Sequence, residues 1–449
     1  MTSAWVPGKA TPFSQGGEGT ASRAVPLSFS IARAWLIATL LLAPLAFGAV
    51  QSWYWAALAV AAAFLLLLWA IGCVQQGAIR THWSPLYIPA ALFLVLGMVQ
   101  YAANCSFNGY ATWESLIKFV TDLVFFFLAD QLWAAAPTKA WERFGLVVTL
   151  YAFSMSLFAI IQFFSSHGLI YWKVKTQGST FGPYVNHDDY AGLLEMLIPI
   201  AAVYVLSRAR SRGERAFLSF ATIVSVCSVL LSGSRGGLIV LLAESIILMA
   251  VFYKQSTGTR PRSVGMIVTL GTGAVALLFF WLAPAHISKR LATVAGLMNS
   301  PEVTLGERWI VWKDSLGIIR NHPLMGTGLG TFEVSFPRHQ SFASDLVWDH
   351  AHNDYVEALA ETGIVGGILM VLALIFFFKT AFKDLTQRLR HEEGWIQLGA
   401  ALGVCGLLVH SVGDFNLHIP ANAAWFAMCA AIATTSARHQ GYRSPESDG

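Results

Sequence analysis

Two arginines and one histidine have the residue types and surroundings needed to act on a phosphate-bearing substrate. Arg235 lies in a short glycine-rich turn between two apolar runs, and Arg308 begins a segment whose apolar residues follow helical spacing. A guanidinium can bind two phosphate oxygens at once, and a helix N-terminus favours anions. His352 precedes a second helical segment, and an ordinary histidine pKa of about 6.5 suits a general base at neutral pH. These patterns predict phosphate binding by the arginines and proton abstraction by the histidine.

Each of these residues also has a plainer interpretation. Arg235 and Arg308 could lie at a membrane interface, where long basic side chains reach lipid headgroups or water. His350 and His352 could cap or pack against the helix that follows them. A zinc site formed by His350, His352 and a carboxylate is a further alternative, although no H-E-x-x-H motif or cysteine ligand accompanies it.

A second polar cluster precedes an apolar run that begins near residue 187. Asn186, His187, Asp188 and Asp189 are consecutive, and a helix N-cap accounts for only one of them. Glu195 follows two turns later, inside the apolar run, where a carboxylate needs a partner or a water-filled cavity. The arginine of the glycine-rich turn is a possible partner. The cluster is therefore a candidate part of the site.

The segment 304–367 contains two predicted helices joined by a turn. Trp309 and Trp312 lie on one stripe of the first helix, as expected for a helix at the level of the lipid headgroups. Pro323 ends this helix, and three glycines follow in a G-x-G-x-G run. No strand precedes that run, so a dinucleotide-binding fold is excluded. In the second helix, Gly363 is expected to break the helix just before the next apolar run.

The remainder of the chain is that of a multi-pass membrane protein. Of the 449 residues, 55% are hydrophobic and only 12% are charged, about half of the charged fraction of a soluble protein. We expect an all-α fold with about twelve transmembrane helices, near residues 31–50, 53–72, 85–101, 114–134, 142–166, 187–207, 216–232, 237–253, 264–283, 362–379, 395–411 and 418–436. The net charge of +4 gives no reason to expect a nucleic-acid partner, and the five cysteines predict neither disulfides nor a metal site.

The distribution of lysine and arginine predicts the topology. With both termini in the cytoplasm, every cytoplasmic connection carries a basic residue, whereas the outer loops 102–113 and 412–417 carry none. We therefore expect a disordered cytoplasmic tail at 1–30, helices one to nine over 31–283, an outer catalytic loop at 284–361, helices ten to twelve over 362–436, and a second cytoplasmic tail at 437–449.

Three motifs in this order resemble the O-antigen ligase and polymerase superfamily. They read SRGG, GERWIVWKDSLGIIRNHPLMGTGLGTF and AHNDYVEALAETGIVGG, and the resemblance covers residues 186–367. It implies a glycosyltransferase of the C type that transfers a glycan from undecaprenyl diphosphate to an acceptor hydroxyl. The reaction would take place at the periplasmic face of the bacterial inner membrane, without a metal, a nucleotide or any other cofactor.

The resemblance also assigns roles to individual residues. It implies that Arg235 and Arg308 bind the diphosphate and that His352, rather than His350, is the base that deprotonates the acceptor for attack with inversion. His322 matches the histidine of the HPL-x-G-x-G motif. The segment 186–189 departs from the usual pattern of the family, which leaves the acceptor preference open. The candidate substrate-binding residues are Asn353, His322, His350, Asn186, Asp189, Glu195 and Trp312.

Three related activities and one unrelated activity fit these patterns. We favour a ligase that joins the glycan to lipid A-core, because a single outer loop with one set of arginines and histidine resembles that branch. A glycan polymerase and a protein O-oligosaccharyltransferase are the alternatives within the superfamily. A transporter of small anions would also suit twelve spans with intramembrane carboxylates, but the sequence shows no pair of repeats. Membrane lipids surround the chain in every case.

Overall fold

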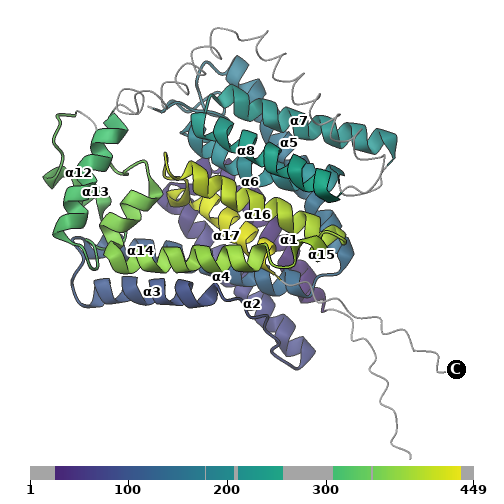
Figure 1. Cartoon of the computed structure of the whole chain (residues 1–449), viewed down its shortest axis with the longest axis horizontal. Helices are drawn as coiled ribbons and strands as arrows, with labels where there is room; N and C mark the ends of the chain where they lie inside the picture. Colours follow the sequence, from purple (N-terminus) through teal and green to yellow (C-terminus); the bar gives the residue numbers. More distant parts are fainter. Residues whose placement is uncertain (1–25, 177, 207–210, 256–306, 345–346, 436–449) are drawn as a thin grey trace, which may run out of the picture.

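The computed structural model describes residues 26–176, 178–206, 211–255, 307–344 and 347–435. These residues form helices joined by loops, and their only β pairing consists of two isolated bridges, Ile170 with Val174 and Phe181 with Tyr184. The all-α fold expected from the sequence is confirmed. Figure 1 shows most of the helices side by side in one bundle, with α12 and α13 at one end of it.

Eight long helices form the first part of the described chain. They are α1 (Leu27–Leu42), α2 (Ser52–Gln76), α3 (Tyr87–Ala102), α4 (Gly109–Ala134), α5 (Thr138–Ser165), α6 (His187–Leu206), α7 (Arg212–Ser232) and α8 (Arg235–Gln255). Two short 3₁₀ turns, η1 (Ala43–Leu45) and η2 (Phe47–Ala49), separate α1 from α2.

The later helices include the segment that carries the catalytic candidates. They are α12 (Glu307–Asn321), α13 (Phe332–Ser335), η3 (Phe336–Arg338), α14 (Asp354–Ala381), α15 (Leu385–Arg388), α16 (Glu392–His410), η4 (Asn416–His418) and α17 (Pro420–Thr434). The predicted outer loop at 284–361 thus contains α12, α13, η3 and the start of α14 in its described part.

The helices correspond to the predicted transmembrane spans, with differences at their ends. Each span has a helix at its place except the ninth, 264–283, which lies outside the described residues. Seven helical segments are long and apolar enough to cross a membrane: Leu27–Leu45, α2, α5, α6, α7, α8 and α14. The first helix begins at Leu27 and not near residue 31, so the last residues of the predicted tail are helical.

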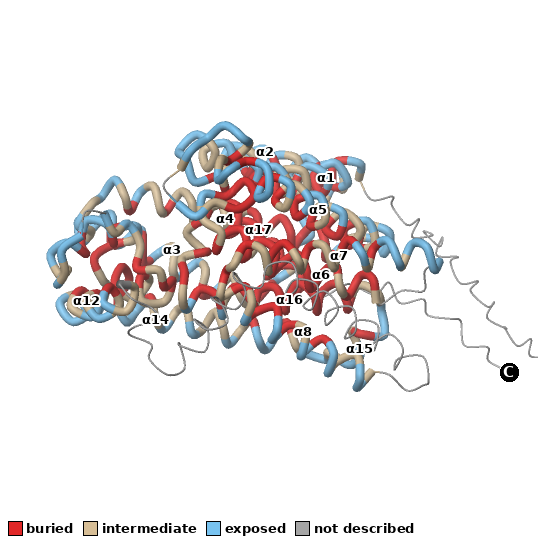
Figure 2. Tube along the Cα trace, turned by 90° about the horizontal axis from the view of Figure 1, so that it is seen from above, coloured by how far each residue is buried: buried red, intermediate tan, exposed pale blue. Residues whose placement is uncertain are grey.

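Helix α6 is the central element of the bundle. Its apolar window is 89% buried within the protein, whereas those of α2 and α14 are 28% and 17% buried. Figure 2 shows the buried residues concentrated along α6, α16 and α17 in the interior. Because α2 and α14 present their apolar side chains outward, they provide the surface that lipid would cover.

Two glycines bring α16 against α6. A Cβ atom on Gly399 would lie 2.8 Å from the Cα of Ile200, and one on Gly403 would lie 2.7 Å from the Cα of Met196. The spacing of four residues places both glycines on one face of α16, the small-xxx-small arrangement that lets membrane helices approach closely. This packing fixes where the segment after α16 emerges.

A break in α14 anchors the turn that follows α12. Gly363 has a φ of 63° and a ψ of −161°, which interrupts the helix as predicted. The freed backbone groups pair with the glycine-rich turn: Ile364 N–H donates to the Pro323 carbonyl at 2.8 Å, and Gly328 N–H donates to the Glu361 carbonyl at 2.9 Å. The turn therefore holds α12 in place along the first half of α14.

Helix α14 begins at Asp354, eight residues before the predicted tenth span. The Asn353 carboxamide oxygen accepts hydrogen bonds from Tyr355 N–H and Val356 N–H, both at 3.0 Å, which starts the helix at the end of the His350–His352 loop. The predicted loop helix and the transmembrane span are the two parts of α14, and they meet at the break at Gly363.

The Gly326 turn yields a prediction of stability. Gly326 and Gly77 both have a φ of 67°, and an alanine in this conformation costs about 1–2 kcal/mol. An added Cβ at Gly77 meets nothing within 4 Å, whereas at Gly326 it would collide with the backbone of Glu361 and Thr362. We expect Gly326→Ala to lower the thermal unfolding midpoint of the purified protein clearly more than the matched control Gly77→Ala. Equal shifts would show that the docked turn tolerates movement.

Candidate functional site

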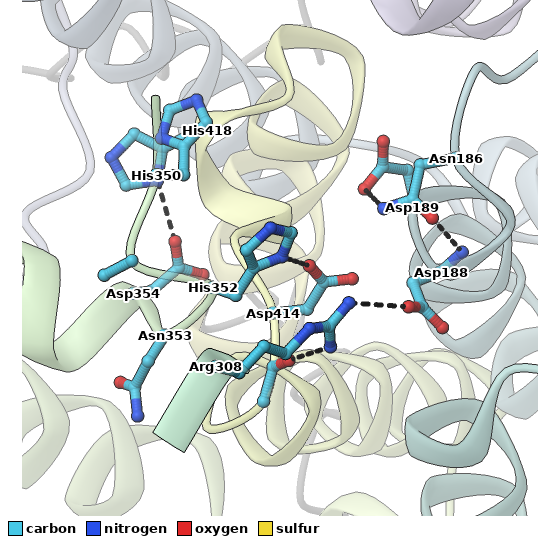
Figure 3. Close-up of polar contacts among 12 residues, drawn as sticks. Asn186, Asp188, Asp189, Arg308, His350, His352, Asn353, Asp354, Asp414 and His418 are labelled. Atoms are coloured by element: carbon cyan, nitrogen blue, oxygen red, sulfur yellow. Dashed lines mark hydrogen bonds and ion pairs between the residues drawn. The ribbon is translucent and has the colours of Figure 1, made fainter. Parts of the chain in front are cut away.

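Arg308 and His352 meet at the loop between α16 and η4. The Nη1 group of Arg308 donates to the Gly413 carbonyl at 2.7 Å, and Nδ1 of His352 lies 3.3 Å from Oδ1 of Asp414. Arg308 comes from the first turn of α12, and His352 from the loop that precedes α14. Figure 3 shows the two side chains converging on Asp414. Three segments that are far apart in the sequence thus form one polar centre.

Asp414 fixes the tautomer of the His352 ring. Its carboxylate is fully buried, and an Nδ1–H directed to it leaves Nε2 as the nitrogen that can accept a proton. The Phe415 and Trp348 rings contact the imidazole edge to face, at centroid distances of 4.8 and 5.9 Å. His352 has a φ of 49°, an unusual conformation for a residue other than glycine. The surrounding contacts therefore fix both the backbone and the ring.

Trp312 and the start of α14 hold the histidine loop from two sides. The Trp312 indole donates to the Ala351 carbonyl at 2.9 Å. The backbone N–H of Asp354 is shared between the carbonyls of Ser411 and Asp414, at 3.0 and 3.2 Å. Trp312 was predicted to bind substrate, but its polar atom is used within the protein, so it positions the loop that carries the candidate base.

Asp188, in the first turn of α6, connects α6 and the residue before α8 to the same polar centre. Its Oδ2 lies 3.6 Å from Nη2 of Arg308, and its carboxylate is hydrogen-bonded to Ser234. Arg235 follows Ser234 directly as the half-buried first residue of α8. Through this carboxylate, the elements that carry the two predicted phosphate-binding arginines are connected to each other.

The two asparagines predicted to bind substrate act as helix caps. Asn186 accepts the Asp188 N–H at 3.0 Å and donates to Asp189 at 3.3 Å. Asn353 uses its oxygen to cap α14 and donates its amide to the Val412 carbonyl at 2.9 Å. Their side chains are occupied by contacts within the protein. Asp189 itself is buried beside α17, where its carbonyl accepts from Asn422 at 2.9 Å.

Glu195 was expected to need a partner, and the structure pairs it with His410. The buried Glu195 carboxylate lies 3.0 and 3.1 Å from Nδ1 of His410, which is the last residue of α16. The C-terminal end of α16 lies close to α6 because the two glycines of α16 bring the helices together. Glu195 therefore belongs to a pair that joins two helices.

His350 lies in a second cluster, away from Asp188. Its Nδ1 is 2.8 Å from Oε1 of Glu357, and the same oxygen is 3.2 Å from Nε2 of His418. Figure 3 shows His350 and His418 on the opposite side of His352 from Asp188. Burial lowers the pKa of His418, but Glu357 and Asp354 outweigh this effect and raise the pKa to about 10. His418 therefore carries a proton at neutral pH when only these residues surround it.

His322 lies at the other end of α12 from Arg308. The two residues are separated by nearly the whole helix, about 20 Å at a rise of 1.5 Å per residue. The His322 ring contacts Phe107 edge to face at a centroid distance of 5.0 Å. Its assignment to substrate binding is not retained, because it does not lie near the polar centre.

Comparison with known proteins shows which family part of the chain resembles. Residues 220–371 match the family model described as O-Antigen ligase. Over 212 residues the chain is 24% identical to "Exopolysaccharide production protein ExoQ" of Rhizobium meliloti (strain 1021), covering 42% of the chain and 46% of that protein. Both matches support the resemblance of the chain to the O-antigen ligase and polymerase superfamily.

The chain is also similar to an uncharacterized protein of Haemophilus influenzae (strain ATCC 51907 / DSM 11121 / KW20 / Rd). The two are 28% identical over 171 residues, which is 35% of the chain and 42% of the relative. The chain thus covers less than half the length of each of these two curated relatives. Together with the seven helical segments long and apolar enough to cross a membrane, the matches indicate a multi-pass membrane protein similar to the O-antigen ligase family.

The structure adds site residues that the sequence did not single out. Gly413, Asp414 and His418 lie in the connection between the last two helices, and His410 ends α16. All four lie outside the 220–371 segment matched by the O-antigen ligase model. The one signal in the sequence is the density of His, Asp and Asn between residues 410 and 418, directly beside two apolar runs.

The Glu195–His410 pair yields a prediction of stability. Removing one partner of a buried pair costs about 3–5 kcal/mol, whereas apolar replacement of both is often neutral. We expect Glu195→Leu to lower stability strongly and the double variant Glu195→Leu/His410→Leu to recover most of the loss, as measured by thermal unfolding in detergent.

The control for this pair is the more exposed contact between Glu114 and Lys118, at 2.7 Å on α4. Glu114→Leu should change stability by about 1 kcal/mol or less. If the double variant lost as much stability as the two single variants together, the proposed coupling of α6 and α16 would be contradicted.

Proposed function

We propose that this protein transfers a glycan from undecaprenyl diphosphate to an acceptor hydroxyl. The reaction would take place at the periplasmic face of the bacterial inner membrane, and both termini would lie in the cytoplasm. The observation that carries the proposal is the meeting of Arg308 and His352 at adjacent residues of one loop, Gly413 and Asp414. A phosphate-binding cation and a proton acceptor held side by side are the two groups this reaction requires.

The contacts of Arg308 orient its guanidinium but leave N–H donors available to a ligand. A guanidinium has five N–H donors, and the bond to the Gly413 carbonyl uses one of them. The contact with Asp188, at 3.6 Å, is an ion pair too long for a hydrogen bond. The planar fork can therefore bind diphosphate oxygens, and Arg235 at the start of α8 would supply the second cation. Together they would stabilise the negative charge that builds on the diphosphate.

His352 supplies the base. With Nδ1–H directed to Asp414, Nε2 would accept the proton of the acceptor hydroxyl, and the buried carboxylate would stabilise the imidazolium that forms. The acceptor oxygen bonds to the anomeric carbon as the bond from that carbon to the diphosphate oxygen breaks. Undecaprenyl diphosphate leaves with the bonding electron pair, and the configuration at the anomeric carbon inverts. The proton on His352 then passes to solvent, which resets the enzyme.

The role of His352 is tested by substitution. General-base assistance contributes about 10²–10⁴-fold in rate, so we expect His352→Ala to reduce transfer from a defined lipid-linked glycan by that factor. Asp414→Asn should also reduce the rate, because the amide can donate to Nδ1 and favour the wrong tautomer. His339→Ala, which alters a histidine at η3, is the matched control. Normal transfer by His352→Ala at a normal protein level would rule out the assignment.

Arg308 is tested by exchange for lysine. The positive charge is retained but bidentate contact with phosphate oxygens is lost, so Arg308→Lys should reduce transfer by at least about tenfold, a loss of roughly 1.4 kcal/mol in transition-state binding. Arg320→Lys, in the last turn of the same helix, is the control. Equal transfer by both variants would show that only charge is needed at position 308.

The acceptor distinguishes the ligase that we favour from a polymerase. A ligase would join the glycan to lipid A-core, and its deletion would leave long repeats stranded on the carrier lipid. The similarity to a protein named for exopolysaccharide production favours the polymerase as the second candidate. In that case deletion would remove the ladder of repeat lengths. In vitro transfer with one lipid-linked donor and alternative acceptors separates the two activities directly.

A further inference from the structure

Two imidazoles and two buried carboxylates form a compact cluster beside the candidate active site. Nδ1 of His350, a carboxylate oxygen of Glu357 and a ring nitrogen of His418 all lie within 4.8 Å of one another. Both rings converge on the same oxygen, Oε1 of Glu357, at 2.8 and 3.2 Å. The two imidazole side chains are 25% and 30% exposed, whereas that of Glu357 is 2% exposed. The Glu357 carboxylate is thus buried, whereas the two imidazoles are partly exposed to solvent.

A second set of contacts orients these side chains. Oδ1 of Asp354 lies 2.8 Å from Nδ1 of His418, so that Nε2 of the ring is directed toward Glu357. The other oxygen of Glu357 accepts the Ala351 N–H at 2.8 Å. A carboxylate on the far nitrogen of a histidine is the usual support of a metal-binding imidazole, because it fixes the tautomer and the ring orientation.

The charge balance of the cluster favours a cation. Asp354 and Glu357 are 5% and 1% exposed, and among the described residues they form ion pairs with the two histidines. Buried carboxylates are normally paired with cations or coordinate metals. One divalent ion bound by the two imidazoles would balance both negative charges.

We propose that His350, Glu357 and His418 bind a divalent transition-metal ion, with zinc as the best fit and Asp354 as the supporting carboxylate. Two histidines and one glutamate are a known ligand set for zinc, with a fourth position left for water. Ligand atoms about 2.0–2.1 Å from a tetrahedral ion lie about 3.3 Å apart. The distances of 2.8 and 3.2 Å therefore need to change by at most about half an ångström.

The ion would act as a clamp and not as a reactant. His350 lies two residues before His352, and His418 lies four residues after Asp414. The ion would join the two loops that carry the candidate base and its carboxylate, and Glu357 would fix both to α14. His352 is not a ligand, which distinguishes this site from a zinc site of His350 and His352. The inference is independent of the proposed transfer reaction.

Cobalt titration of the purified full-length chain in detergent tests the site. After treatment with a chelator, we expect one Co²⁺ per chain with the visible absorption of a four-coordinate ion, and displacement of Co²⁺ by Zn²⁺. His350→Ala and His418→Ala should abolish this spectrum, and Asp354→Asn should weaken binding by about 10–100-fold. His339→Ala and His352→Ala should bind as the unaltered protein does.

The outcomes against the proposal are equally definite. Absence of stoichiometric Co²⁺ and Zn²⁺ binding by the unaltered protein would overturn it, whatever the variants do. Binding that persists in the double variant His350→Ala/His418→Ala would identify an adventitious ion only. Since the readout is spectroscopic, loss of transfer activity in His352→Ala with normal Co²⁺ binding separates the fate of the proposed reaction from that of the metal site.

Discussion

The close packing of α16 against α6 is the contact on which the candidate site depends. Gly399 and Gly403 bring the two helices to within backbone distance, and the end of α16 then lies beside the start of α6. As a result, Gly413 and Asp414 emerge next to Asp188, and Arg308 can contact both segments. A larger side chain at either glycine would move the loop of Gly413 and Asp414 relative to Asp188, the carboxylate that faces Arg308.

Polar groups inside the bundle set how the helices are rotated against one another. Apolar surfaces alone leave rotation weakly specified in lipid, because lipid is as apolar as the helix surface. Glu195 and His410 pair across α6 and α16. The buried carboxylate of Asp130, on α4, accepts from Tyr87 at 2.8 Å and lies 2.9 Å from His82. Rotation of a helix would separate these partners, so the contacts favour the observed rotation of α6, α16 and α4.

The sequence predicted the helices well because their signal is local. Runs of apolar residues locate the spans, and Gly363 was correctly expected to interrupt α14. The helix ends were less accurate: α14 starts at Asp354 because Asn353 caps it, and the cap was interpreted as a binding residue. Asn186 shows the same ambiguity, since a capping residue and a substrate-binding residue have the same polar side chain.

The site could be predicted only in part, because half of it consists of pairings across the fold. Arg308 and His352 stand in recognisable motifs, but Asp414 has none, and it is 62 residues from the histidine that it orients. Glu195 clearly needed a partner, yet His410 is 215 residues away. A pattern in the sequence can show that a buried charge requires a partner. It cannot show which of several distant groups the helix packing brings to it.

One segment, residues 410–418, supplies partners to several systems at once. His410 pairs with α6, Gly413 and Asp414 hold Arg308 and His352, and His418 joins the cluster at the start of α14. Arg308 and His352, the proposed phosphate-binding group and base, therefore cannot move independently, because a shift of this segment displaces both. A misplacement of about 1 Å can cost about 10²-fold in rate. Anchoring the segment at its two ends keeps the distance between the two groups constant while substrates enter and products leave.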